Sequence, residues 1–469
     1  MALSRAVKVI LCVFAMPVMA WTLASLYFTF AGCDISGDFT SDYHPSPQNL
    51  KPEENAYVAI KEYAENLPSN TTPLHVNYRL RRAYLDGTTN RLALADEARA
   101  YIAAESNTIA VAKRILSSKG IEVPFEEVTL ANMHIWKLMR IAHVYNIKAI
   151  CEAVQGDLEE GRRSLMEAYR IGHFLLTHDS PLLEIPRALA YVIYTHALRS
   201  AEKPLFAPDD DEAWRVKLRE LNISLHEGDP EGAKKAARRH LDGIVRTVIV
   251  DHATNRSAVA RGMYGVCNLW EGAIAGKNSI DDVHRIKDLE RGFLEMLTTV
   301  CPGYARYSFQ PNRTYAAQCA KLEEFCRKVD GPVYDVEYAT EYERMSVDRF
   351  SRNWIPRRIF AADWCSSYKL LFSMRFTSRV RTARLACRSY KAKYGRYPET
   401  LSALVPEFLA EVPRDPYDGE ELRYNEKDGF IWTRGERLAF DGNVTITKKG
   451  KPYFRTYSDE RCVIFLDKP

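Results

Sequence analysis

Acidic side chains cluster in turns near the C-terminal end of the chain. Asp415, Asp418 and Glu420 lie in a segment rich in proline and glycine, and Asp441 lies in a later turn. Hard cations such as Ca²⁺ prefer several oxygen ligands held close together, so Asp415 and Asp418 are candidate ligands of a Ca²⁺ ion. The alternative is that these carboxylates shape the turns through local hydrogen bonds, because two arginines of the 433–437 segment oppose a cation.

Basic side chains dominate a second segment, between Trp364 and Pro398. It contains no acid and nine basic residues: Lys369, Arg375, Arg379, Arg381, Arg384, Arg388, Lys391, Lys393 and Arg396. Apolar residues recur there at helical spacing, which predicts a helix with one buried stripe. A different face of this helix carries four of the basic residues, Arg381, Arg384, Arg388 and Lys391. These four are candidates for contact with anionic lipid headgroups or an acidic envelope polymer; the favoured interpretation is a solvated face paired with acids elsewhere in the fold.

Motifs of the common catalytic classes are missing from the sequence. It contains no His-Glu-x-x-His, Gly-x-Ser-x-Gly, phosphate-binding loop, Gly-x-Gly-x-x-Gly or Cys-x-x-Cys. We therefore assign no catalytic or cofactor-binding residue, apart from the candidate Ca²⁺ ligands, and favour a non-enzymatic role. The formal net charge of +4 predicts no bulk attraction to nucleic acid.

Tyrosines at 334, 338 and 342 recur every four residues beside several glutamates. A helix with this pattern presents its rings along one face. Such a stripe would line a glycan- or peptide-binding groove, or pack at the rim of a helical core.

One uncharged run, Val9–Gly32, is long enough to cross a membrane. As a helix its twenty-four residues would extend about 36 Å, and Arg5 and Lys8 precede it. Because positive residues stay on the cytoplasmic side, the rest of the chain should lie outside the cytoplasm. We predict a signal anchor over residues 1–33 that places residues 9–32 in the lipid bilayer of the cytoplasmic (inner) membrane.

Two other interpretations of this segment remain open. A cleaved signal peptide would end near Ala20, although the apolar run continues past that site. A lipoprotein signal would end at Cys33, which would then carry the lipid. All three interpretations place the bulk of the chain in the same compartment. Residues 34–52, which include three prolines, then predict a stiff polar stalk.

A helical domain is predicted over residues 53–362, because apolar residues recur there at spacings of three and four. Expected helices outside the 130–178 segment lie at 92–118, 183–201, 211–224, 281–299 and 314–329, and the basic helix that follows this domain is expected at 363–394. Within 130–178, a turn at Gly156-Asp157 separates two helices, and a second such turn lies at 228–229. Each turn is followed five residues later by a small residue, Gly161 or Ala233, which lets neighbouring helices approach closely. These helix pairs resemble tetratricopeptide repeats, which implies an irregular hairpin array or solenoid; two ordinary helical hairpins are the alternative.

The last part, residues 363–469, combines the basic helix with a small strand-rich tail. Short strands are expected at 422–424, 430–433, 444–447 and 463–465, separated by Asp-Gly turns. Residues 366–445 resemble the globular end of the major pseudopilins of type II secretion systems. The matching residues are Tyr390, Gly395, Tyr397, Pro398, Leu401, Val412, Pro413, Asp415, Pro416, Gly419 and Tyr424.

The pseudopilin resemblance implies a long helix followed by turns and a hairpin, with Ca²⁺ held in the region of Asp415. The prepilin methylation motif is absent from the N-terminal segment, so assembly through that segment is not implied. The layout is similar to that of large, membrane-anchored bacterial envelope proteins.

These features predict a mainly α protein with a small C-terminal α/β segment and one N-terminal transmembrane helix. We expect a membrane-anchored, extracytoplasmic interaction or scaffold protein that binds a protein partner in the envelope. The alternatives are an accessory component of a secretion or pilus-like apparatus, and an extracytoplasmic enzyme with dispersed catalytic residues.

Overall fold

The computed structural model describes residues 50–67, 95–122, 134, 137–177, 184–203, 205–208, 210–224, 230–241, 310–344, 354–436, 438, 445–446, 452–453 and 462–466. The predicted anchor at 9–32, Cys33 and nearly all of the 34–52 stalk lie outside these residues. The predicted helix at 281–299 and the turn at 228–229 also lie outside them. No helix in the described ranges is both long and apolar enough to cross a bilayer.

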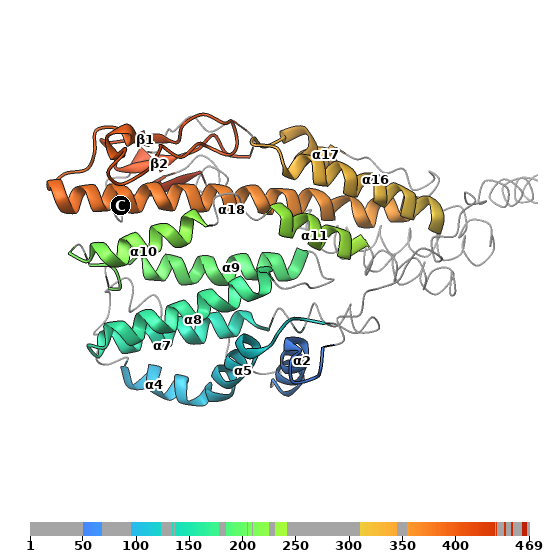
Figure 1. Ribbon diagram of the computed structural model, residues 1–469, viewed down its shortest axis with the longest axis horizontal. Helices are drawn as coiled ribbons and strands as arrows, with labels where there is room; N and C mark the ends of the chain where they lie inside the picture. Colours follow the sequence, from blue (N-terminus) through green and yellow to red (C-terminus); the bar gives the residue numbers. More distant parts are fainter. Residues whose placement is uncertain are drawn as a thin grey trace, which may run out of the picture. The chain divides into compact units, whose positions relative to one another are not determined.

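Helices dominate the described ranges, which confirms the mainly α prediction (Figure 1). The helices are α2 (Ala56–Asn66), α4 (Ala95–Ala104), α5 (Ser106–Ser117), α7 (Met139–Val154), α8 (Leu158–Thr177), α9 (Glu184–Ala201), α10 (Glu212–Ile223), α11 (Pro230–His240), α16 (Pro311–Val329), α17 (Val336–Arg344) and α18 (Trp354–Tyr394), with a 3₁₀ turn at Leu401–Leu404. The strands are β1 (Arg423–Asn425), β2 (Phe430–Trp432), β3 (Thr445–Ile446), β4 (Pro452–Tyr453) and β5 (Val463–Phe465).

The chain divides into two compact units that differ from the predicted domains. One unit comprises residues 47–240, 325–339 and 366–469, and the other comprises 1–46, 241–324 and 340–365. The predicted boundary between residues 362 and 363 therefore does not separate a helical domain from a tail. Residues 366–469 pack in the same unit as the helices α2 to α11.

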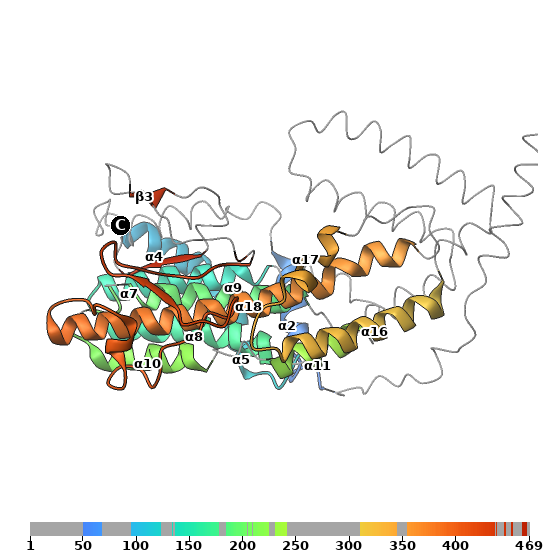
Figure 2. The same cartoon turned by 90° about the horizontal axis from the view of Figure 1, so that it is seen from above.

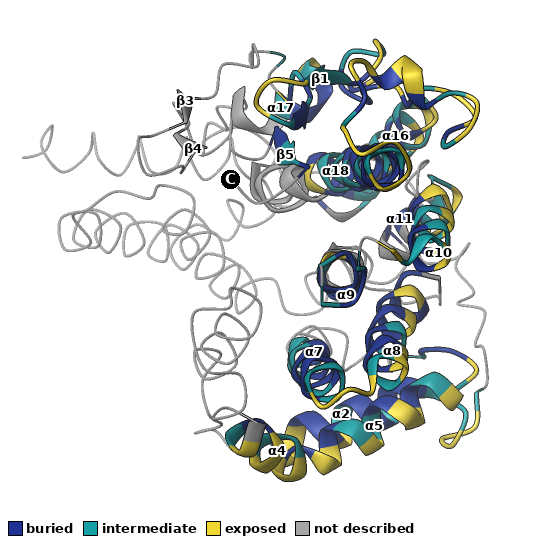
Figure 3. Ribbon diagram, turned by 90° about the vertical axis from the view of Figure 1, so that its left-hand side faces the viewer, coloured by how far each residue is buried: buried dark blue, intermediate teal, exposed yellow. Residues whose placement is uncertain are grey.

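Helices α7, α8 and α9 pack side by side, with their buried faces turned toward one another (Figure 3). Gly156, at a φ of +99°, ends the first of them and allows the turn into α8. A Cβ atom at Gly161 would lie 2.7 Å from the carbonyl oxygen of Ala149, and one at Gly172 would lie 2.8 Å from the nitrogen of Tyr194. The predicted turn at 156–157 and the close approach at Gly161 are therefore confirmed.

Two predicted helices have different bounds in the structure. The helix expected at 92–118 is divided into α4 and α5 at Glu105, whose buried carboxylate accepts a 2.6 Å hydrogen bond from Thr108 and a 2.8 Å bond from Arg140. The helix expected at 363–394 begins at Trp354, so α18 is 41 residues long. Its last residue agrees with the prediction, because Gly395 adopts a φ of +77° there.

The short strands form two antiparallel groups. One sheet has the order β1-β2-β5, in which Tyr424 faces Ile431 and Ile431 faces Ile464. Strands β3 and β4 form a separate pair. The segment that includes β1 and β2 lies against the C-terminal half of α18, where the ring of Phe376 contacts that of Tyr417 (Figures 1 and 2).

Candidate functional site

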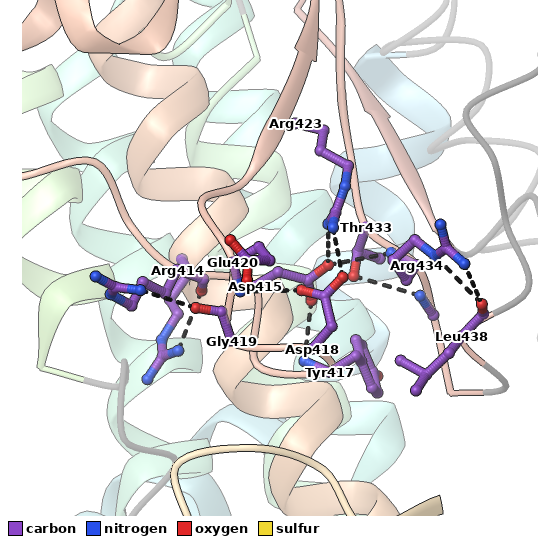
Figure 4. Close-up of polar contacts among 12 residues, drawn as sticks. Arg414, Asp415, Tyr417, Asp418, Gly419, Glu420, Arg423, Thr433, Arg434 and Leu438 are labelled. Atoms are coloured by element: carbon purple, nitrogen blue, oxygen red, sulfur yellow. Dashed lines mark hydrogen bonds and ion pairs between the residues drawn. The ribbon is translucent and has the colours of Figure 1, made fainter.

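The predicted acidic cluster is formed by a tight turn before β1. The backbone nitrogen of Asp415 donates to the carbonyl of Glu420 at 2.7 Å, and that of Gly419 donates to the carbonyl of Asp415 at 2.9 Å. Gly419 has a φ of +82°, which favours glycine at this position. The turn brings the side chains of Asp415 and Asp418 to the same point, as the sequence predicted (Figure 4).

A guanidinium lies between these two carboxylates. Arg423, on β1, donates from Nη1 to Oδ2 of Asp415 at 2.9 Å and from Nη2 to Oδ2 of Asp418 (Figure 4). The backbone nitrogens of Tyr417 and Arg434 also donate to Asp415, at 2.9 and 3.1 Å. The positive charge at the cluster is thus supplied by a side chain of the protein itself.

Burial makes Asp415 the unusual member of this cluster. Its side chain is fully buried, and this burial raises the pKa of Asp415 above its ordinary value. Hydrogen bonds from Thr433, Tyr417 and Arg434 oppose that rise by favouring the charged carboxylate. The contacts match the turn-shaping alternative, and they do not test whether Asp415 and Asp418 bind Ca²⁺. No group of three or more metal-ligating side chains occurs within the described ranges, and Asp441 lies outside them.

The sequence interpretation missed Arg423. The sequence contained a signal for it. The strand predicted at 422–424 follows Asp418 after only three residues, so Arg423 must lie close to the turn. Arg434, one of the two arginines in the 433–437 segment, instead donates from Nη2 to the carbonyl of Leu438 at 2.8 Å.

Five arginines in the part of α18 whose side chains are described share one kind of partner, which is a backbone carbonyl. Their hydrogen bonds run from Arg375 to Val329 and Gly331 (both 2.9 Å), from Arg379 to Arg414 (3.1 Å), from Arg381 to Thr195 (3.3 Å), from Arg384 to Leu466 (3.3 Å) and from Arg388 to Glu202 (2.7 Å). Two of these partners, the carbonyls of Val329 and Glu202, lie at the C-terminal ends of α16 and α9, where the helix dipole is negative. The guanidiniums of α18 thus connect this helix to backbone carbonyls of several other segments.

The expected surface role of the basic face is wrong for two of its four residues. Arg381 and Arg388 are only 3% and 7% exposed, because their guanidiniums reach into the protein toward α9 and the chain just after it. Arg384 keeps a side-chain exposure of 21%, and Lys391 is partly exposed, with Nζ 4.4 Å from the ring centre of Tyr397. A continuous basic face on the surface is therefore not formed.

One buried acid lies beside these arginines. Glu202, just after α9, is 2% exposed, and its carboxylate oxygens lie 3.7 Å from Arg381 Nη1 and 3.4 Å from Arg384 Nη1. The favoured interpretation, that the basic residues pair with acids elsewhere in the fold, holds for these two arginines, although in the interior rather than in solvent.

The tyrosine stripe belongs to the core. Tyr334 and Tyr338 are each 4% exposed, and their ring centres lie 5.3 and 5.0 Å from that of Tyr368 on α18. These two rings therefore do not line an open groove. The side chain of Tyr342 lies outside the described part of the chain.

Comparisons with known proteins give no relative for this chain: no family model, no curated protein and no solved structure matches it.

Proposed function

We propose that this chain is a non-catalytic, membrane-anchored scaffold protein that binds a protein partner outside the cytoplasm. Residues 9–32 would hold it in the inner membrane, with the N-terminus inside. The observation that supports a scaffold is the set of arginine–carbonyl bonds along α18, which joins α9, α16, the acidic turn and β5 to one long helix. Such a framework is suited to presenting surfaces in a fixed geometry.

A second candidate function is an accessory of a secretion or pilus-like apparatus, with the tail as its docking element. The order of elements in the tail favours this candidate. A long helix is followed by a glycine turn, a 3₁₀ turn at 401–404, the acidic turn and an antiparallel hairpin. This is the order that the pseudopilin resemblance implies.

Site-specific photocrosslinking in intact membranes distinguishes the two candidates. Ile223 at the end of α10 and Tyr394 at the end of α18 are large apolar side chains that are 51% and 48% exposed. A photoreactive residue at 223 should capture a protein partner if the helices bind it, whereas one at 394 should do so if the tail docks. Arg99, an exposed residue of α4, provides the control position. Crosslinks from neither 223 nor 394 would contradict both candidates.

Fractionation tests the proposed location separately. We expect the full chain to stay in the membrane pellet after alkaline extraction, and to be digested by protease added from the outer side of the inner membrane. Recovery of the full chain in the soluble cytoplasmic fraction would contradict the proposed anchor and both candidate functions.

A further inference from the structure

Two guanidiniums, one on the buried Arg381 and one on the partly exposed Arg384, share a single carboxylate at the junction of α9 and α18. Among the described residues, Glu202 is the acid that contacts Arg381 and Arg384, at 3.7 and 3.4 Å. Charge-assisted hydrogen bonds are shorter than this, at about 2.7–2.9 Å. These contacts are therefore long for ion pairs that lie in the interior of a protein.

The local charge is unbalanced toward the positive side. Buried charges are normally paired, and a guanidinium offers five N–H donors. The carbonyls of Thr195 and Leu466 accept one hydrogen bond each from Arg381 and Arg384. Burial lowers the pKa of Arg384, and repulsion by Arg388 and Arg381 lowers it further against the attraction of Glu202. An added negative charge beside Arg384 would relieve this repulsion.

The buried acid also has an unused acceptor. Oε1 of Glu202 accepts no hydrogen bond, although the residue is 2% exposed. A ligand that fits here must therefore offer oxygens to the two guanidiniums and a hydrogen to the carboxylate. Phosphate at neutral pH has both, since it is an anion that still carries a proton. Sulfate has no proton to give, and neither does the phosphodiester of a lipid headgroup.

We propose that Arg381, Arg384 and Glu202 form a binding site for inorganic hydrogen phosphate. Phosphate oxygens accept from the two guanidiniums, and the phosphate hydroxyl donates to Oε1 of Glu202. Arg384, whose side chain is 21% exposed, is the more accessible of the two arginines. The site is independent of the proposed scaffold function, because it requires no protein partner.

Calorimetric titration of the full chain in detergent micelles tests the site, with sodium phosphate and sodium sulfate as the probes at pH 7 and constant ionic strength. We expect saturable phosphate binding, and sulfate binding that is weaker by about tenfold or more because it leaves Glu202 unsatisfied. Arg384→Gln should weaken phosphate binding by about tenfold or more. Arg396→Gln removes an exposed arginine that pairs with Glu399, so it should leave phosphate binding unchanged.

A second variant reports on selectivity rather than on folding. Glu202→Gln replaces a carboxylate, which only accepts hydrogen bonds, by an amide that also donates. The ratio of the phosphate affinity to the sulfate affinity should therefore fall toward one. Absence of saturable phosphate binding, equal affinity for sulfate in the native chain, or unchanged phosphate binding in Arg384→Gln would each overturn the proposal. Competition by phosphatidylglycerol vesicles would overturn the assignment to a free ion and point to a lipid headgroup.

Discussion

At the scale of single residues, Arg423 decides the character of the acidic turn. Its guanidinium pairs with Asp415, which is fully buried, and with Asp418, and both carboxylates belong to one turn. Removing one partner of a buried ion pair leaves an uncompensated charge, which costs more free energy than the intact pair contributes. The turn is therefore expected to depend on this arginine.

Arg423→Ala should lower the free energy of unfolding by about 2–3 kcal/mol, because Asp415 then lies buried without its cation. The same variant should also bind a cation at the acidic cluster, because Asp415 and Asp418 no longer share a guanidinium. Millimolar Ca²⁺ should therefore raise the melting temperature of the variant, whereas the native chain should melt at the same temperature in Ca²⁺ and in EDTA. Thermal unfolding under both conditions measures this, with Arg396→Ala as the control. A Ca²⁺ response of the native chain would instead show that Asp415 and Asp418 bind the ion beside Arg423.

The site was predicted from the sequence only in part. Proline and glycine around Asp415 and Asp418 dictate a tight turn, and a tight turn necessarily gathers its own side chains. The partner of these carboxylates depends on where the next strand returns, which is a property of tertiary packing. The same limit applies to Arg381 and Arg388, because helical periodicity places a charge on a face without showing what covers that face.

At the scale of elements, α18 stabilises the fold through the hydrogen-bonding geometry of its guanidiniums rather than through its net charge. Arg375 is the clearest case, since its two terminal nitrogens donate to the carbonyls of Val329 and Gly331 at 2.9 Å each. A lysine carries the same charge but lacks the planar fork that meets two acceptors at once.

Arg375→Lys should therefore destabilise the protein by about 1–2 kcal/mol, although the charge is kept. Chemical denaturation of the variant and the native chain measures the difference. Arg396→Lys is the matched control, because the Arg396 side chain is 68% exposed and its replacement by lysine should change the free energy of unfolding by less than about 0.5 kcal/mol. Equal stability of Arg375→Lys and the native chain would mean that charge alone matters at this position.

Close helix packing gives a second prediction at this scale. Gly161→Ala places a methyl group 2.7 Å from the backbone oxygen of Ala149, and backbone cannot move aside as a flexible side chain would. We expect a loss of about 1–3 kcal/mol, although alanine is intrinsically the better helix former. Arg163→Ala, at an exposed position of the same helix, should have little effect in the same denaturation experiment. A Gly161→Ala variant that is more stable than the native chain would show that α7 and α8 can separate without cost.

Helix positions were well predicted where a local signal marks the end. Gly156 and Gly395, both at positive φ, mark the ends of α7 and α18 in the sequence itself. The break at Glu105 carries no such residue, and its carboxylate instead bonds to Arg140, 35 residues away. Ends that depend on such distant contacts cannot be read from periodicity.

At the scale of the whole molecule, the association of the C-terminal part with the helices is the main departure from the predicted layout. The sequence predicted a helical domain over residues 53–362, followed by a last part over 363–469 that combines a basic helix with a strand-rich tail. The structure places residues 366–469 in one unit with 47–240. The contacts that join them are specific, and they include the hydroxyl of Tyr191, which lies 2.6 Å from that of Thr377, and the guanidinium bonds from α18 to α9.

A fragment of residues 53–362, the predicted helical domain, should therefore fail to fold cooperatively. It lacks most of α18, which contributes buried apolar side chains such as Phe372 and Leu385 and donates to the Thr195 carbonyl on α9. The apolar surface that packs against these side chains would then be exposed to water, and a core left incomplete in this way loses its cooperative transition. Residues 34–469, which lack only the predicted anchor, should unfold in a single transition for the 47–240 and 366–469 unit. Near-ultraviolet circular dichroism during heating compares the two chains. A native-like spectrum and a sharp transition for 53–362 would restore the predicted boundary, and would mean that the arginine–carbonyl bonds of α18 attach a tail rather than complete a core.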